Sequence, residues 1–148
     1  MDDKSKQIAD LNPLIRAIQE LERVQHEPRM LVIVTHGYIE LIINTLIDAR
    51  CKNANRIQSS NREYPHAVKV IILHELGVLS DHEVALLDWF RRLRNDAAHD
   101  AVFDLTADRL QVFALKRQRD PTNFKNLCSV LLYDLLMSHR NELFPVLI

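Results

Sequence analysis

The strongest constraint on the fold lies in residues 80–99, where a helix start signal precedes a long apolar repeat. Ser80 and Glu83 are spaced as a capping box, in which each side chain binds a backbone N–H group at the start of a helix. Apolar residues then recur at intervals of four, three and four, which is the spacing of one helix face: Leu86, Phe90, Leu93 and Ala97. This segment predicts a capped, amphipathic helix.

Composition supports a helical fold for the rest of the chain. Glycine is scarce, with two among 148 residues, and few glycines leave few positions for the tight turns that join strands. A chain of this length, 47% of it apolar, can bury the core of one domain. We therefore expect residues 1–148 to form a single compact all-α domain.

Helical periodicity predicts a bundle of about five helices. Besides residues 80–99, the expected helices are those of residues 12–24, 29–52, 64–77 and 120–136. Residues 29–52 are so apolar that we expect a central helix contacted from several sides. The polar residues 53–63 are expected to form a loop, and Thr106 to begin a short helix that ends near Leu115.

Apolar residues predict the buried faces of the first and last helices. In the first helix the expected face is Leu11, Ile15, Ile18, Leu21 and Val24. In the last helix it is Phe124, Leu127, Cys128, Leu131, Leu132, Leu135 and Leu136. Trp89 faces away from the apolar repeat of its own helix, so we expect it in a second contact surface, such as a homodimer interface.

Charge and patterning exclude several classes of function. A net charge of −1 gives no global attraction to nucleic acid or to an anionic membrane, so RNA binding would need a local basic patch. The N-terminus is polar and no run of 18 apolar residues is uninterrupted, so we expect neither a signal peptide nor a membrane span. Cys51 and Cys128 form no CxxC pair, which indicates reduced thiols and a cytoplasmic protein.

The residues with the most chemical character are the hexapeptide Arg-Asn-Asp-Ala-Ala-His at positions 94–99. Arginine offers planar, permanently charged donors that match a phosphate, and histidine exchanges a proton near neutral pH. On RNA, His99 could take the proton of a 2′-hydroxyl while Arg94 stabilises the charge on the phosphate, without a metal. Arg91 and Arg92 lie one turn earlier and would extend the patch, binding RNA phosphates without reading sequence.

Helix geometry leaves the hexapeptide open to more than one interpretation. Arg94 and His99 lie about 140° apart around an ideal helix. They converge only if the helix ends or bends at the two alanines before His99, or if a second copy of the chain completes the site. In a purely structural interpretation, His99 caps the helix and Arg94 pairs with a carboxylate. The candidate carboxylates are Glu40, Asp88 and Asp96.

Other chemical sites have little support in the sequence. The seven histidines form no HExxH motif and the cysteines lack metal-type neighbours, so we expect no metal site and no cofactor. The chain has no glycine-rich phosphate loop, which excludes nucleotide hydrolysis of the P-loop kind. The histidines at 36, 66 and 74 are expected to be polar groups on packed helices, and those at 26 and 139 to be solvated.

The hexapeptide resembles the arginine–polar–three residues–histidine signature of the HEPN superfamily, a set of small helical bundles. The resemblance covers about residues 30–100 and is closest to the mannitol-repressor-like branch and to a related group of bacterial helical domains. The segments that carry it are residues 36–40, 64–69, 76–80 and 93–99.

Two functions follow from the resemblance. Many HEPN proteins are metal-independent endoribonucleases of toxin, defence or RNA-processing type, and act as homodimers in which two such motifs face each other. By this resemblance Arg94 would bind the scissile phosphate, His99 would be the acid and base, and Asn95 would orient the site. The mannitol-repressor branch is regarded as regulatory, so the alternative is a non-catalytic module with a protein partner, an antitoxin or a regulator. The chain has no obvious helix-turn-helix, so direct DNA binding is not expected.

Overall fold

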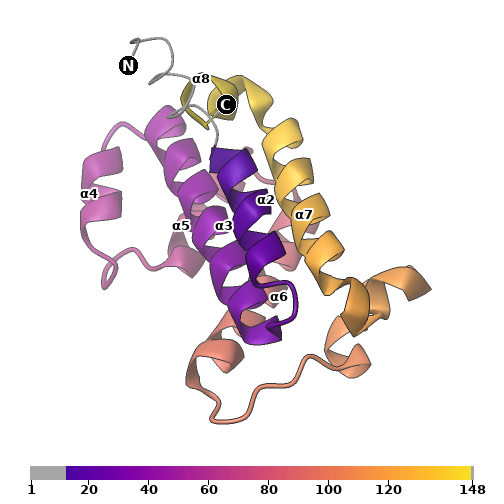
Figure 1. Ribbon diagram of the computed structural model, residues 1–148. Helices are drawn as coiled ribbons and strands as arrows, with labels where there is room; N and C mark the ends of the chain where they lie inside the picture. The colour runs from indigo at the N-terminus through magenta and orange to yellow at the C-terminus, as the bar shows by residue number, and fades with distance from the viewer. Residues whose placement is uncertain (1–12, 148) are drawn as a thin grey trace, which may run out of the picture.

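The chain folds as an all-α bundle, as the sequence predicts. The structure, a computed structural model, describes residues 13–147, and that range contains no strand (Figure 1). Its α-helices are α2 (Pro13–Arg23), α3 (Pro28–Arg50), α4 (Ala54–Ser59), α5 (His66–Glu75), α6 (Asp81–His99), α7 (Phe124–Ser138) and α8 (Arg140–Leu147). Three short 3-10 helices lie between α6 and α7: η1 (Ala107–Leu110), η2 (Lys116–Arg119) and η3 (Pro121–Asn123).

The central helix is α3, which packs against α2, α4, α5, α6, α7 and α8. The prediction of a helix contacted from several sides is therefore confirmed. By length and composition alone α3 could also cross a membrane, since its most apolar window has a mean hydropathy of 1.7. In the structure 56% of that window is buried, as in the core helix of a packed bundle.

Helix α6 begins as predicted and runs without a break to its last residue. Ser80 Oγ accepts a hydrogen bond from the Glu83 N–H at 3.1 Å, and Glu83 Oε1 accepts one from the Ser80 N–H at 3.0 Å. The residues it buries are Leu87, Phe90, Leu93 and Ala97. Leu86 was expected in this set but is only partly buried, because the buried face begins one residue later.

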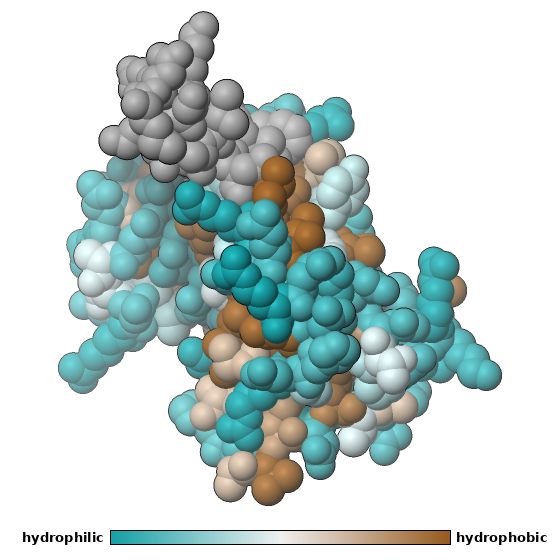
Figure 2. Space-filling view, viewed as in Figure 1, coloured by the Kyte–Doolittle hydropathy of each residue, from teal (hydrophilic) through white to brown (hydrophobic). Residues whose placement is uncertain are grey.

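The expected buried face of α2 is partly wrong. Ile15 and Ile18 are 50% and 38% exposed, whereas Ala17 and Leu21 are buried and Leu14 packs beside them. The helix therefore meets the bundle along Leu14, Ala17 and Leu21, which are spaced as i, i+3 and i+7. Figure 2, which has the same view as Figure 1, shows apolar surface between hydrophilic residues on the face that carries α2. The expected contact of Leu11 and the expected start of this helix at residue 12 lie outside the described residues.

Three other expected boundaries differ from the structure. The segment expected as a loop contains the short helix α4, and the helix expected from Thr106 is only the 3-10 turn η1. The last expected helix is preceded by η3 and ends at Ser138, after which α8 follows. Its predicted apolar face is buried except for Leu127, which is partly buried. His139, expected to be solvated, is 7% exposed because it sits between α7 and α8 against the start of α6.

Candidate functional site

A cleft of about 630 Å³ lies where α3, α5 and α6 meet. Helix α6 contributes Arg94 and Asn95 of the predicted hexapeptide site and Arg91 of the predicted basic patch. The other lining residues come from α3, from α5 and from the connection between them: His36, Glu40, Ile43, Asn44, Gln58, Asn61, Pro65, His66, Ala67 and Lys69. We refer to this hollow as the α3–α5–α6 cleft.

Arg94 lines the cleft with its guanidinium unneutralised by a carboxylate. Its Nη1 donates a hydrogen bond to the Oδ1 atom of the adjacent Asn95 at 3.4 Å. No ion pair within residues 13–147 includes Arg94. A half-buried arginine with this freedom retains donors for an anion that enters the cleft.

None of the three carboxylates that might have paired with Arg94 forms an ion pair with it in the described part of the chain. Asp96 accepts a hydrogen bond from Arg109 Nη1 at 2.7 Å. Asp88 pairs with two arginines of its own helix, Arg91 at 2.7 Å and Arg92 at 2.9 Å. Glu40 Oε1 lies 3.9 Å from the Nδ1 atom of His36. The purely structural interpretation of Arg94 is therefore not what the geometry shows.

His99 is not part of the cleft formed by its own chain. It is the exposed last residue of α6, and the helix does not bend before it, since the Asp100 N–H still binds the Asp96 carbonyl at 2.8 Å. A bend that brings Arg94 and His99 together within one chain is therefore ruled out in this structure. Completion of the site by a second copy remains a prediction.

The two arginines predicted to extend the basic patch have different positions. Arg91 lines the cleft, and its Nε atom is buried without a hydrogen-bond partner. Arg92 is 72% exposed at its side chain and is not among the residues that line the cleft. Lys69 adds a charge that the sequence did not suggest, because its buried side chain reaches the cleft and donates to Asn44 Oδ1 at 3.0 Å.

Two histidines that the sequence placed only on packed helices meet in this cleft. The ring centroids of His36 and His66 are 4.8 Å apart. His36 is 4% exposed, and its Nε2 atom and both ring nitrogens of His66 are buried without a hydrogen-bond partner among residues 13–147. The spacing of His36 and Glu40, four residues apart in a helical segment, was a signal in the sequence. The approach of His66 follows from packing of α5 on α3 and had no local signal.

Burial and the nearby cations keep both imidazoles uncharged near neutral pH. Burial is the largest cause that lowers the pKa of His36 to about 3, and the nearby His66, Arg94 and Arg91 contribute the rest of that shift. Burial likewise lowers the pKa of His66 to about 4, with Arg91, Lys69 and Arg94 adding to the effect. The cleft thus combines three cations, two neutral imidazoles and one carboxylate. This combination favours an anionic ligand.

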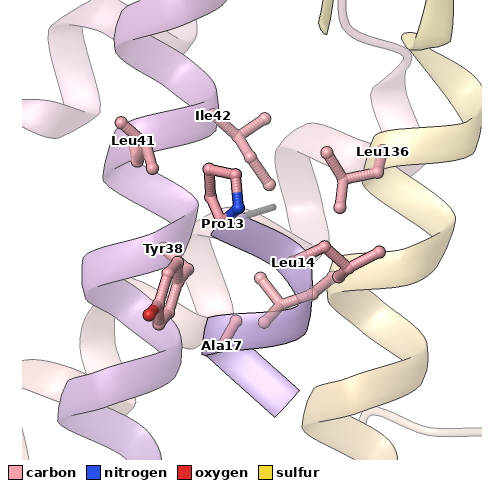
Figure 3. A pocket seen from close by; sticks show the side chains of 8 residues that line it. Pro13, Leu14, Ala17, Tyr38, Leu41, Ile42 and Leu136 are labelled. Atoms are coloured by element: carbon pink, nitrogen blue, oxygen red, sulfur yellow. The ribbon is translucent and has the colours of Figure 1, made fainter. Parts of the chain in front are cut away.

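Two further features lie outside the cleft, a small apolar hollow and the side chain of Trp89. A small hollow of about 10 Å³ between α2, α3 and α7 is lined almost wholly by apolar side chains (Figure 3). Trp89, expected at an interface, packs edge-on against Phe90 and Phe113 and donates from Nε1 to the Arg109 carbonyl at 3.1 Å. The second contact surface of Trp89 is thus the segment of its own chain that contains Arg109 and Phe113.

The fold and the cleft define a class, an all-α bundle with a cationic cleft at the junction of three helices. No family model, curated protein or solved structure matches the chain.

Proposed function

We propose that the protein is a HEPN-type endoribonuclease that cleaves RNA without a metal ion and binds the scissile phosphate in the α3–α5–α6 cleft. The observation that carries this proposal is Arg94, whose guanidinium lines an open cleft without a carboxylate partner among the described residues. Arg91 and Lys69 add positive charge on the same cleft, in a chain whose net charge is close to zero. A local patch of this kind attracts a polyanion where the whole chain does not.

The reaction requires an acid, a base and a stabilised phosphate. The 2′-hydroxyl gives its proton to the base and its oxygen bonds to phosphorus, while the bond from phosphorus to the 5′-oxygen breaks and that oxygen takes up a proton. Arg94 stabilises the charge that builds on the phosphate oxygens, and Asn95 holds its guanidinium in place. His99 serves as acid and base, contributed by the second chain of a homodimer, because it is exposed outside the cleft of its own chain. A cytoplasmic location and an antitoxin or regulator as partner belong to the same proposal.

One observation favours a second candidate, a non-catalytic regulatory module like those of the mannitol-repressor branch. The exposed position of His99 means that a single chain does not place an acid or base from the hexapeptide beside Arg94. The same cleft would then bind an acidic segment of a protein partner through Arg94 and Arg91.

RNA cleavage in EDTA distinguishes the two functions. Purified protein is incubated with total cellular RNA and with tRNA, beside folded Arg94→Ala and His99→Ala variants. We expect the wild type to cleave and each variant to lose about 100-fold or more in rate, the usual cost of removing a charge stabiliser or a general acid and base. Arg23→Ala is the matched control, because Arg23 is exposed on α2 and does not line the cleft.

The results of this cleavage assay distinguish the nuclease from the regulatory module. Cleavage that survives in both variants would contradict the role given to the hexapeptide. No cleavage by the wild type would exclude the nuclease and support the regulatory module.

A further inference from the structure

We propose that the α3–α5–α6 cleft contains a binding site for a divalent transition-metal ion such as Zn²⁺, with His36, Glu40 and His66 as its protein ligands. Nothing in the sequence motif or in the proposed RNA chemistry assigns this site. It is carried by the convergence of the three side chains and by buried ring nitrogens that have no hydrogen-bond partner among the described residues.

The three side chains already converge. Each offers one potential ligand atom, and these three atoms lie within 4.8 Å of one another. His36 and Glu40 are one turn apart on α3, and His66 is the first residue of α5. Ligands held about 2.0–2.2 Å from a tetrahedral zinc ion are themselves somewhat over 3 Å apart. Small side-chain rotations would therefore bring the three atoms to coordinating distance.

The hydrogen-bonding state of the rings independently points to a ligand. His36 is almost wholly buried, and its Nε2 atom has no hydrogen-bond partner in the part of the chain that the structure describes. Both ring nitrogens of His66 are buried and without a partner as well. Buried polar atoms without partners carry a desolvation cost that a native structure normally avoids. A coordinated ion would satisfy one nitrogen on each ring.

The charged side chains near the site have opposite effects on the binding of a metal ion. Arg91, Arg94 and Lys69 lie near the site and weaken the binding of any cation. Glu40 supplies the negative charge that offsets part of the repulsion. An anion bound at Arg94 would offset more of it.

The donor set selects the class of ion. Two imidazole nitrogens and one carboxylate oxygen match the preferences of zinc and its first-row neighbours, whereas calcium and magnesium prefer oxygen ligands. Three protein ligands leave a fourth position for water or a substrate atom. All three residues line the same cleft as Arg94.

This inference does not rest on the proposed function. RNA cleavage is measured in EDTA, and metal binding is measured without RNA, so each can fail while the other succeeds. A nuclease that cleaves in EDTA and also binds zinc would hold the metal as an accessory group.

Calorimetric titration of ZnCl₂ into metal-stripped protein without a histidine tag tests the site at pH 7. We expect one ion per chain for the wild type, and affinity reduced by about tenfold or more in His66→Ala and in Glu40→Gln. His26→Ala is the control, because His26 is exposed in the turn after α2, and its affinity should equal that of the wild type. Absence of binding, or binding unchanged in His66→Ala, would overturn the proposal.

A second measurement protects the test against misfolded variants. Co²⁺ added to the wild type should give the visible absorption of a site of low coordination number, and stoichiometric Zn²⁺ should abolish it. Absorption that resembles free hexa-aqua Co²⁺, at protein concentrations that saturate zinc, would contradict a built site. His66→Asn, which keeps a polar side chain of similar reach, replaces His66→Ala if circular dichroism shows that the alanine variant is unfolded.

Discussion

At the scale of the residue, Glu83 connects two distant parts of the chain. Its carboxylate accepts a hydrogen bond from the Ser80 N–H at the start of α6 and lies 2.6 Å from the Nε2 atom of His139. Burial on its own raises the pKa of Glu83, but the hydrogen bonds from His139 and Ser80 outweigh it, so the pKa lies below its usual value. The ionised form is therefore the one that the fold stabilises.

We expect Glu83→Gln to lower the free energy of unfolding by about 1–2 kcal/mol at pH 7, since a hydrogen bond to a charged group is weakened. A carboxyl group whose pKa is lowered in the folded state stabilises the fold above its usual pKa of 4.5, and loses that contribution as pH falls through the lowered value. The difference between wild type and variant in urea unfolding should accordingly shrink from pH 7 to pH 3.

Glu63→Gln is the control for this experiment, because Glu63 is exposed and its side chain forms no ion pair among the described residues. Comparing each variant with the wild type at the same pH separates Glu83 from other groups that titrate in acid. A difference that stays constant from pH 7 to pH 3 would contradict the role given to the carboxylate.

Local residues could be predicted from the sequence where their partners are also local. The Ser80–Glu83 capping box spans one turn, and Arg94 with Asn95 falls on a helix whose periodicity is strong. His139 could not be predicted, because its partner Glu83 is 56 residues away. His36 and His66 could not be paired for the same reason, since their contact depends on how α5 packs on α3.

At the scale of the element, the two glycines have opposite roles. Gly77 ends α5 with φ of +71°, and beyond it the Val78 N–H binds the Leu73 carbonyl at 2.9 Å, which is the closure expected of a glycine cap. Gly37 lies inside α3, where glycine is a poor helix former. A Cβ atom added at either position would meet no atom within 4 Å beyond the adjacent residues and the nearby backbone of its own helix. Substitution at each site therefore tests backbone conformation without a clash.

We expect Gly77→Ala to destabilise the protein by about 1–2 kcal/mol, because alanine is strained in the left-handed region. Gly37→Ala should instead stabilise it by up to about 1 kcal/mol, through higher helix propensity and a less flexible unfolded chain. Thermal and urea unfolding of the two variants give both signs. If the two substitutions changed the free energy of unfolding equally, the left-handed conformation of Gly77 would not be a source of strain in Gly77→Ala.

The elements that were predicted wrongly from the sequence are those stabilised by hydrogen bonds to other helices of the bundle. Helix α4 is polar, and its Gln58 binds α3 through the Asn44 carbonyl at 3.1 Å and Asp48 at 2.6 Å. The segment after α6 is fixed by the bond from Trp89 to the Arg109 carbonyl. Neither interaction leaves a periodic pattern, so residues 54–59 were expected to be a loop and the helix after Thr106 was expected to be longer.

At the scale of the whole molecule, the arrangement of helices decides which charged residues can act together. Packing of α5 and α6 on α3 collects Arg91, Arg94 and Lys69 in one cleft, although Lys69 lies 22 residues before Arg91 in the sequence. The same packing leaves His99 on the outer end of α6. If the protein cleaves RNA with Arg94 and His99, the two must therefore come from different chains.

Mixing inactive variants tests this requirement. In a homodimer with two composite sites, an Arg94→Ala chain paired with a His99→Ala chain regains one intact site, made of Arg94 from the second chain and His99 from the first. Equal amounts that exchange freely form mixed dimers in about half of cases, so about a quarter of wild-type RNA cleavage should return. The double variant Arg94→Ala/His99→Ala, mixed with either single variant, provides the control, because no pairing then rebuilds a site. Recovery in that control, or none in the mixture although light scattering shows dimers that exchange, would place the acid and base outside the hexapeptide.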